Sequence, residues 1–412
     1  MTNHPEHSTT TLRGNWHLAA FALAMHSALM IVALPSAQAQ TVTVLHTFSG
    51  PDGLYPYSGV TLDGAGNLYG TTYGGGANQA GTVYQLKRSG SNYIHNQLHA
   101  FAGGNDGQQP WGGVIFGPDG ALYGTTTAGG FEGAGTVFSL RPPVTICRSA
   151  LCPWTESVLY GVGQFGGLMP AYGQVAFDSA GNIYGTTAFG GIGEYGDVYE
   201  LSRTGNGWTG TEVYSFGDPD AQYPANNVML DSEGNLYGTT DGGGLDSEGA
   251  VFQLVRAGSG WSENILANFG AFGAGGYGAT GLIMDAAGNL YGGTLGAENT
   301  AASVFELSRS GSGWQFTVLH SFTSGPACWG NLVLDNSGNL YGTTYSLGTH
   351  GMGNIFKLSP SGGGWTYTDL YDFSNNGDGE NPTGDLTMDA DGNIYGTNLG
   401  ENGHGVVWKL TP

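Results

Sequence analysis

The chain has 412 residues, of which 77 are glycine and 12% are aromatic. This aromatic content excludes a disordered glycine-rich linker, and the absence of a Gly-X-Y period excludes collagen. A formal net charge of -22 argues against nucleic acid and anionic lipid as partners.

Residues 1–39 have the composition of a signal peptide. Arg13 precedes an apolar run from Leu18 to Leu34, and Ala37-Gln38-Ala39 follows as a cleavage signature. We expect cleavage after Ala39, which leaves residues 40–412 as a secreted or periplasmic protein without a membrane span. A retained leader that anchors the protein in a membrane is the alternative.

From Thr41 onward, four strand-like runs recur in a fixed order. Examples are GVTLD (59–63), NLYGTT (67–72), GTVYQL (81–86) and VTVLHTF (42–48). The second run contains a tyrosine in each of seven copies: Tyr69, Tyr123, Tyr184, Tyr237, Tyr291, Tyr341 and Tyr395. Repeats of about 50 residues indicate propeller blades or solenoid turns.

The two ends of the chain complement each other. The last copy stops after its third run, near Leu410, and a fourth run stands alone at residues 41–48, before the first copy. We therefore predict an all-β fold: a seven-bladed β-propeller of four-stranded blades. In this fold strand 41–48 pairs onto the last blade (386–410) and leaves no open sheet edge. A β-solenoid is the alternative.

The turn between the first and second runs has the pattern D-x-x-G-N. Asp63 is expected to accept hydrogen bonds from turn amides, and Gly66 and Asn67 suit positive φ. Gly70, after the repeated tyrosine, is expected to let a neighbouring sheet approach closely.

An insertion is predicted at residues 142–157, and it contains the sequence CRSALC. Cys147 and Cys152 are expected to form a local disulfide outside the cytoplasm, and Cys328 is left over. A metal site built from these cysteines is not expected, because no His or further Cys stands at zinc spacing.

The repeated GNLYGTT…GG…GTVF phrase resembles the GloVer (Gloeo/Verruco-type) tandem-repeat family of exported bacterial proteins. It is less closely similar to streptogramin-lyase and NHL-type β-propellers. The resemblance covers roughly Val42 to Leu410 and implies export without an established activity. Many members of that family carry a C-terminal anchoring segment. This chain ends at Pro412, directly after a blade strand, which favours a freely released product.

Two sets of loops share one side of the predicted ring, which we call the top face: those from the fourth run to the first, and those from the second run to the third. They hold many Asp and Glu residues but no Lys or Arg. Four aromatic residues recur six positions before the turn Asp or its counterpart. We expect these aromatics and three loop acids to bind a ligand: Tyr57, Trp111, Tyr172, Trp329, Asp52, Asp106 and Asp378. Solubility and packing between blades are the alternative explanations.

Two positions further along, side-chain oxygens replace glycine in four copies. Gln174, Asn227, Asn331 and Asp385 are the candidate ligands of a hard cation such as Ca²⁺. A bound ion there could assist hydrolysis or elimination. No catalytic residue is predicted.

The sequence therefore favours a monomeric binding module for a polysaccharide or a protein partner, without a required cofactor. A calcium-assisted hydrolase or lyase at the channel mouth is the alternative.

Overall fold

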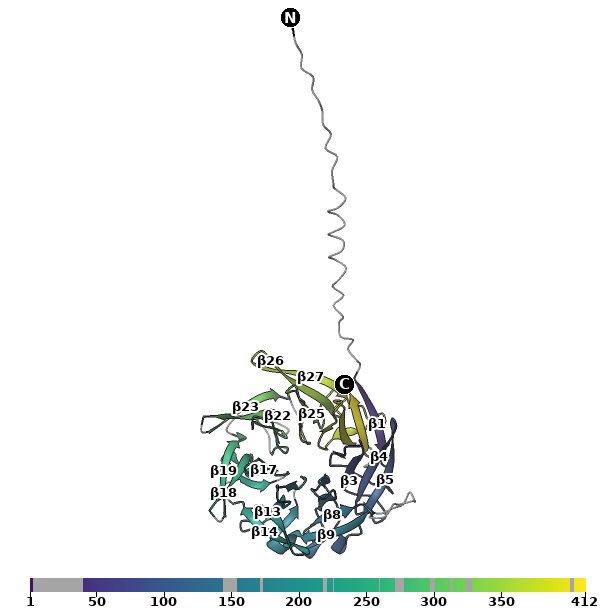
Figure 1. Ribbon diagram of the computed structural model, residues 1–412, viewed down its shortest axis with the longest axis vertical. Helices are drawn as coiled ribbons and strands as arrows, with labels where there is room; N and C mark the ends of the chain where they lie inside the picture. The colour runs from purple at the N-terminus through teal and green to yellow at the C-terminus, as the bar shows by residue number, and fades with distance from the viewer. Residues whose placement is uncertain are drawn as a thin grey trace. The chain divides into compact units, whose positions relative to one another are not determined.

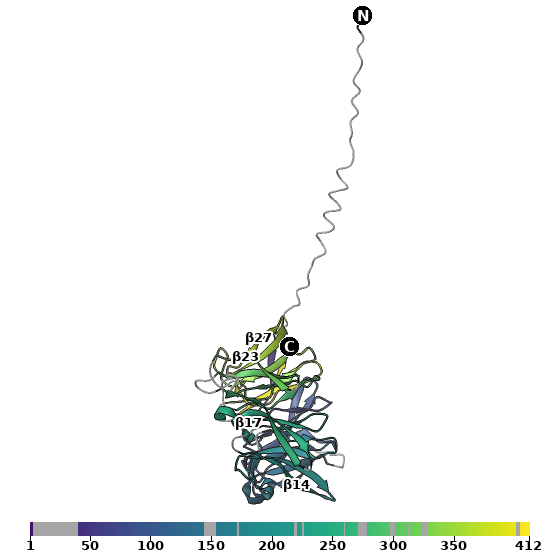
Figure 2. The ribbon, with the colours of Figure 1, turned by 90° about the vertical axis from the view of Figure 1, so that its left-hand side faces the viewer.

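The computed structural model describes residues 1–2, 40–143, 154–170, 173–217, 221–224, 226–258, 260–270, 278–296, 301–311, 313–323, 328–400 and 404–412. The compact unit Gln40–Pro412 is a seven-bladed β-propeller of four-stranded blades arranged as a ring (Figure 1). Figure 2 shows the same blades from the side. No helix among the described residues is both long and apolar enough to cross a membrane.

Each blade runs outward from the centre of the ring in the order of its sequence. The innermost strands have two residues each: β2 (Thr61–Leu62), β6 (Ile115–Phe116), β11 (Ala176–Phe177), β16 (Met229–Leu230), β20 (Ile283–Met284), β24 (Val333–Leu334) and β29 (Thr387–Met388). The second strands carry the YGTT phrase: β3 (Leu68–Thr72), β7 (Leu122–Thr126), β12 (Ile183–Gly190), β17 (Leu236–Gly243), β21 (Leu290–Gly293), β25 (Leu340–Thr344) and β30 (Ile394–Leu399).

The third strands are largely buried between neighbouring blades: β4 (Thr82–Ser89), β8 (Thr136–Arg141), β13 (Asp197–Thr204), β18 (Ala250–Ala257), β22 (Ser303–Ser310), β26 (Asn354–Ser361) and β31 (Val406–Thr411). The outer strands are β5 (Asn92–Ala100), β9 (Thr155–Gly161), β14 (Gly207–Ser215), β19 (Gly260–Asn268), β23 (Gly313–Ser321), β27 (Gly364–Asp372) and β1 (Thr41–Thr47). All neighbouring strands pair antiparallel. We number the blades 1 to 7 by their innermost strands, from β2 to β29.

Short elements complete the top loops. Three additional strands pair with the extended ends of second strands: β10 (Gly167–Pro170), β15 (Ala221–Pro224) and β28 (Glu380–Pro382). Four 3-10 turns that fall entirely within the described residues lie in these top loops: η1 (Gly104–Asp106), η2 (Phe131–Gly133), η3 (Val162–Phe165) and η4 (Leu245–Ser247).

The predicted closure of the ring is confirmed. β1 pairs antiparallel with β31, from Thr41 opposite Thr411 to Thr47 opposite Val406, so the first strand completes blade 7. Phe48 then packs with the core of blade 1, next to Tyr84. At the seam, β31 is therefore paired on both sides, with β30 and with β1.

The glycine after each repeated tyrosine has a different role from the one predicted. A methyl group on Gly70 would lie 2.4 Å from the hydroxyl oxygen of Tyr84, which is its cross-strand partner within the same blade. In every blade an aromatic side chain of the third strand lies over this glycine. The glycine therefore makes room for a ring of its own sheet, and not for the neighbouring sheet.

The D-x-x-G-N turn behaves largely as predicted. Oδ1 of Asp63 accepts hydrogen bonds from the amides of Ala65 (2.9 Å) and Asn67 (2.8 Å). Gly66 has φ of 82°, but Asn67 does not have positive φ and instead donates its side-chain amide to Oδ2 of Asp63 at 2.7 Å. Tyr69 donates its hydroxyl to the same carboxylate at 3.1 Å. The turn thereby fixes the tyrosine and the end of the blade.

Blade 2 keeps this turn with a displaced acid. Gly117 stands where the other blades have Asp, and Asp119 takes over, accepting hydrogen bonds from the Ala121 amide and the Tyr123 hydroxyl. The predicted insertion also differs in extent, because its last residues from Thr155 onward belong to strand β9. Cys147 and Cys152 lie outside the described residues, as does most of the predicted leader 1–39. Both remain predictions.

Candidate functional site

A pocket of about 250 Å³ lies at the top mouth of the central channel. Its walls come from loops that precede the innermost strands and from residues at the ends of the second strands. The lining residues are Tyr57, Ser58, Trp111, Gly113, Gly173, Asn226, Asn227, Asp241, Ala279, Leu295, Trp329, Thr383 and Asp385. Loops of all seven blades therefore converge on one concave site.

One half of the pocket wall is aromatic. Tyr57 stacks face to face on Trp111 of the next blade, with ring centroids 4.3 Å apart and planes 8° from parallel. Tyr73 meets both rings edge-on. On blade 6, Trp329 stacks on Tyr345 at 5.0 Å and keeps 41% of its surface exposed. These flat faces can receive an apolar or ring-shaped ligand.

The other half of the wall carries amide and carboxyl groups beside the apolar residues Ala279 and Leu295. Asn226 donates its side-chain amide to the Ala279 carbonyl at 2.6 Å, which links blades 4 and 5. Asp241 follows the YGTT phrase of blade 4, and its Oδ1 atom is buried without a hydrogen-bond partner among the described residues. Burial raises the pKa of Asp241 to about 7. This carboxyl can donate or accept a hydrogen bond from a ligand near neutral pH.

Three of the four predicted cation ligands meet at the floor of the pocket. The Asn331 amide N–H donates to Oδ1 of Asp385 at 2.8 Å, and its side-chain amide donates to Oδ1 of Asn227 at 3.2 Å. Burial raises the pKa of Asp385, while the hydrogen bond from Asn331 opposes that change. Gln174, the fourth predicted ligand, lies against blade 2, because a methyl on Gly113 would lie 2.6 Å from its Nε2 atom.

Glycines allow the chains to come this close at the centre. A methyl group on Gly59 would lie 2.0 Å from the Asp385 carbonyl oxygen, and one on Gly173 would lie 1.9 Å from the Asn227 nitrogen. Neighbouring blades thus contact each other through their backbones below the pocket. The floor is built from backbone and from the side chains that replace glycine at the repeat position of Gly59.

The predicted acids Asp52, Asp106 and Asp378 lie elsewhere. Each accepts hydrogen bonds from backbone amides directly after an outer strand, from Ser49 at 2.8 Å, Ala102 at 2.6 Å and Ser374 at 3.1 Å. Each also contacts a ring of that strand: His46 at 3.0 Å, His99 at 3.3 Å and Tyr371 at 3.0 Å. None lines the channel-mouth pocket. They hold the top loops in place at the rim of the ring.

Of the four predicted aromatic residues, Tyr57, Trp111 and Trp329 line the pocket, and Tyr172 lies outside the described residues. Asp241, Leu295 and Asn226 also line the pocket but were not predicted as site residues. The sequence could have indicated Asp241 and Leu295. Both stand one residue beyond the second threonine of YGTT or its counterpart, where blades 1 and 6 have Tyr73 and Tyr345.

Seven four-stranded blades around a pocketed channel define the class of this protein as a seven-bladed β-propeller. Within that class, the chain belongs to the Gloeobacter/Verrucomicrobia repeat family, whose model matches residues 30–151, 152–327 and 295–412. No curated protein matches the chain.

Two of the solved structures that match the chain are distantly similar to it. One is a presumed oxidoreductase (glucose dehydrogenase) from Thermus thermophilus, with 15% identity, a TM-score of 0.45, and 73% of this chain and 96% of that chain covered. Another is a presumed gluconolactonase, with 13% identity, a TM-score of 0.42, and 73% and 87% covered. Such values do not assign an activity.

Proposed function

We propose that this protein is a secreted binding module that takes a sugar unit of a polysaccharide into the channel-mouth pocket. The observation that carries this proposal is the two-sided wall, with stacked aromatic rings on one half and amide and carboxyl groups on the other. A pyranose ring presents apolar C–H faces and hydroxyl edges, so it matches both halves at once.

The size and charge of the pocket support a saccharide more than a protein partner. The pocket has a volume of about 250 Å³ and is concave, as small-molecule sites are. A stable protein interface buries a much wider surface of about 800 Å² per partner. The top loops carry no Lys or Arg, which disfavours polyanionic saccharides. Neutral or cationic polysaccharides are therefore the favoured class.

The test is binding of the purified protein to an array of immobilised polysaccharides, followed by titration with the best soluble fragment. Trp111→Ala and Trp329→Ala are each expected to weaken binding about tenfold or more, because each removes a stacking face. Thermal unfolding of each variant checks that it remains folded.

Trp208→Ala is the matched control, since Trp208 packs under Arg203 at 4.8 Å on the face opposite the pocket. Its affinity is expected to equal that of the unaltered protein. Equal binding by the Trp111 and Trp329 variants would rule out the pocket as the saccharide site.

A calcium-assisted hydrolase or lyase remains the second candidate, because Asn227, Asn331 and Asp385 meet at the pocket floor. Their three side chains supply fewer oxygens than the 6–8 that Ca²⁺ takes, so waters and ligand would complete the shell. Bound calcium in elemental analysis of the purified protein and a calcium-dependent shift in Tm distinguish this candidate. Neither effect is expected of the binding module.

Export is part of the proposal. N-terminal sequencing of the protein from periplasm or medium is expected to begin at Gln40. Recovery of the chain in the membrane fraction with its leader intact would favour the anchored alternative instead.

A further inference from the structure

A second group of metal-binding side chains lies at the rim, where the ring closes. His46 lies on β1, the outer strand of blade 7, and His95 lies on β5, the outer strand of blade 1. Their rings stack with centroids 4.5 Å apart and planes 14° from parallel. Asp52 belongs to the loop that leads from β1 into blade 1. All three side chains are partly buried.

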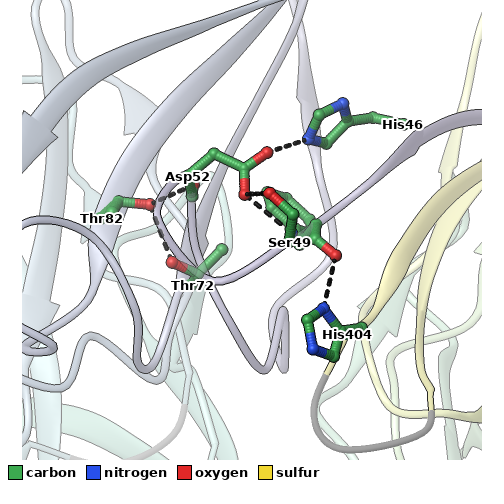
Figure 3. Close-up of polar contacts among 7 residues, drawn as sticks. His46, Ser49, Asp52, Thr72, Thr82 and His404 are labelled. Atoms are coloured by element: carbon green, nitrogen blue, oxygen red, sulfur yellow. Dashed lines mark hydrogen bonds and ion pairs between the residues drawn. The ribbon is translucent and has the colours of Figure 1, made fainter.

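The potential ligand atoms already lie close together. Nε2 of His46 and Oδ2 of Asp52 are 3.0 Å apart, and Figure 3 shows the His46 ring directed at this carboxylate. One ligand atom from each of the three residues lies within 4.8 Å of the other two. Nε2 of His95 is buried and has no hydrogen-bond partner among the described residues.

We propose that His46, Asp52 and His95 bind a divalent transition metal ion of the Zn²⁺ type, which joins the closing strand β1 to β5 across the seam. Two imidazoles and one carboxylate are a common protein ligand set for Zn²⁺, with water in the fourth position. Nitrogen ligands distinguish this site from the oxygen-only group at the pocket floor, which suits Ca²⁺.

Coordination requires two adjustments. Nε2 of His46 has to exchange its hydrogen bond with Oδ2 of Asp52 for the metal ion, and its proton moves to Nδ1. The stacked His95 ring has to turn its Nε2 atom toward Asp52. This nitrogen gives up no hydrogen bond within the described residues when it turns. The Asp52 carboxylate is held in place by the backbone amide and hydroxyl of Ser49, at 2.8 and 2.9 Å. The loop thus presents a fixed ligand (Figure 3).

The interfaces between other pairs of adjacent blades, called seams here, separate metal binding from packing. His320 stacks on Tyr367 with nearly the same geometry, 4.5 Å and 15°, so the stack itself does not require a second histidine. In the next seam His99 contacts Asp106 at 3.3 Å, but Glu156 takes the strand position of His95, opposite the repeated leucine. Among the described residues, only the closing seam combines two histidines with a carboxylate.

The experiment is calorimetric titration of the purified protein, free of any polyhistidine tag, with Zn²⁺. One equivalent is expected to bind and to raise Tm. His95→Tyr copies the natural pair His320–Tyr367 and should fold, but it removes a ligand. Loss of an outer-shell partner already weakens metal binding about 10–100-fold, so loss of a ligand is expected to cost about 100-fold or more.

His320→Tyr is the matched control, because it changes a stacked histidine that is not in the group, and it should bind Zn²⁺ normally. Co²⁺ provides a second readout, since visible absorption bands report nitrogen ligation in the unaltered protein. The proposal is overturned if Zn²⁺ does not bind, or if His95→Tyr binds it as tightly as the unaltered protein does.

Discussion

Asp197 is a buried carboxyl at a position where most blades place a neutral residue. It begins the third strand of blade 3, and the equivalent residues are Thr82, Thr136, Ala250, Ser303, Asn354 and Val406. Burial, with Glu212 and Glu194 nearby, raises the pKa of Asp197 to about 7. The ionised form is therefore disfavoured in the folded protein.

This pKa sets a direction for stability against pH. The folded-state value lies above the ordinary value near ~3.9, so the folded protein keeps a proton that the unfolded chain has lost. The contribution of Asp197 to the free energy of unfolding is therefore highest below about pH 4, and falls as the pH rises to about 7. Asp197→Asn is expected to stabilise the protein by roughly 1–3 kcal/mol at pH 8, with little gain near pH 4.

Thermal and urea unfolding at pH 4, 6 and 8 measure this effect. Asp391→Asn is the control, because Asp391 is exposed and its substitution should leave stability nearly unchanged. A gain for Asp197→Asn that does not depend on pH would contradict the assigned cause.

At the residue scale, sequence reasoning selected Asp385 at the channel mouth but missed Asp241, and it selected three loop acids that do not line the pocket. Tyr57, Trp111 and Asn227 were predictable because their distance from the turn Asp is fixed by the strand. Asp52 and Asp378 could not be placed in this way. Each lies in a loop within a few residues of a backbone amide that donates a hydrogen bond to it. Such a local hydrogen bond keeps a short carboxylate side chain away from the pocket.

At the element scale, the pairing of glycine with an aromatic ring determines how the second and third strands pack. In blade 4, a methyl group on Gly238 would lie 2.5 Å from Cζ of Phe252, its cross-strand partner. Phe252 is fully buried and belongs to the core shared with blade 3. It therefore has little room to move aside.

Gly238→Ala is accordingly expected to lower the free energy of unfolding by about 1–3 kcal/mol through overpacking. The double variant with Phe252→Leu should recover part of this loss, and denaturant unfolding of the single and double variants measures the coupling.

Gly260→Ala is the control, since a methyl group there meets nothing within 4 Å and no positive φ is involved. Equal losses at Gly238 and Gly260 would show that the contact with the Phe252 ring does not explain the effect.

The four strands of each blade could be predicted because their patterns repeat along the chain. The partner of the glycine could not, since the sequence alone does not give the register between β17 and β18. That register puts Gly238 opposite Phe252 and leaves the neighbouring sheet further away. The contact between His46 and His95 was hidden for a similar reason, because it depends on how two adjacent outer strands are staggered.

At the scale of the whole molecule, the closure was predictable by counting, because a missing fourth strand at one end matched an extra strand at the other. The ladder between β1 and β31 bears this out. His404 adds a contact across the seam, with Nδ1 lying 3.1 Å from the Phe48 carbonyl oxygen (Figure 3). Loss of β1 would expose the edge of β31.

A chain that starts at Phe48 is therefore expected to unfold at a Tm lower by roughly 10 °C or more, and to self-associate through the open edge. Size-exclusion chromatography and thermal unfolding measure both effects. A synthetic peptide of residues 40–47 should restore part of the stability.

A chain that starts at Gln40 is the control and should behave as a stable monomer. If the shorter chain kept the same Tm and stayed monomeric, β1 would be dispensable and ring closure would not depend on it.

The pairing of Thr41 with Thr411 also orders events during biosynthesis. The first strand of the ring to be synthesised has no partner until the last strand has been made. Blades 1 to 6 can each form from consecutive segments, whereas blade 7 requires both ends of the chain. Because contacts between distant segments form slowly, joining of the termini is expected to be the final and slowest folding step.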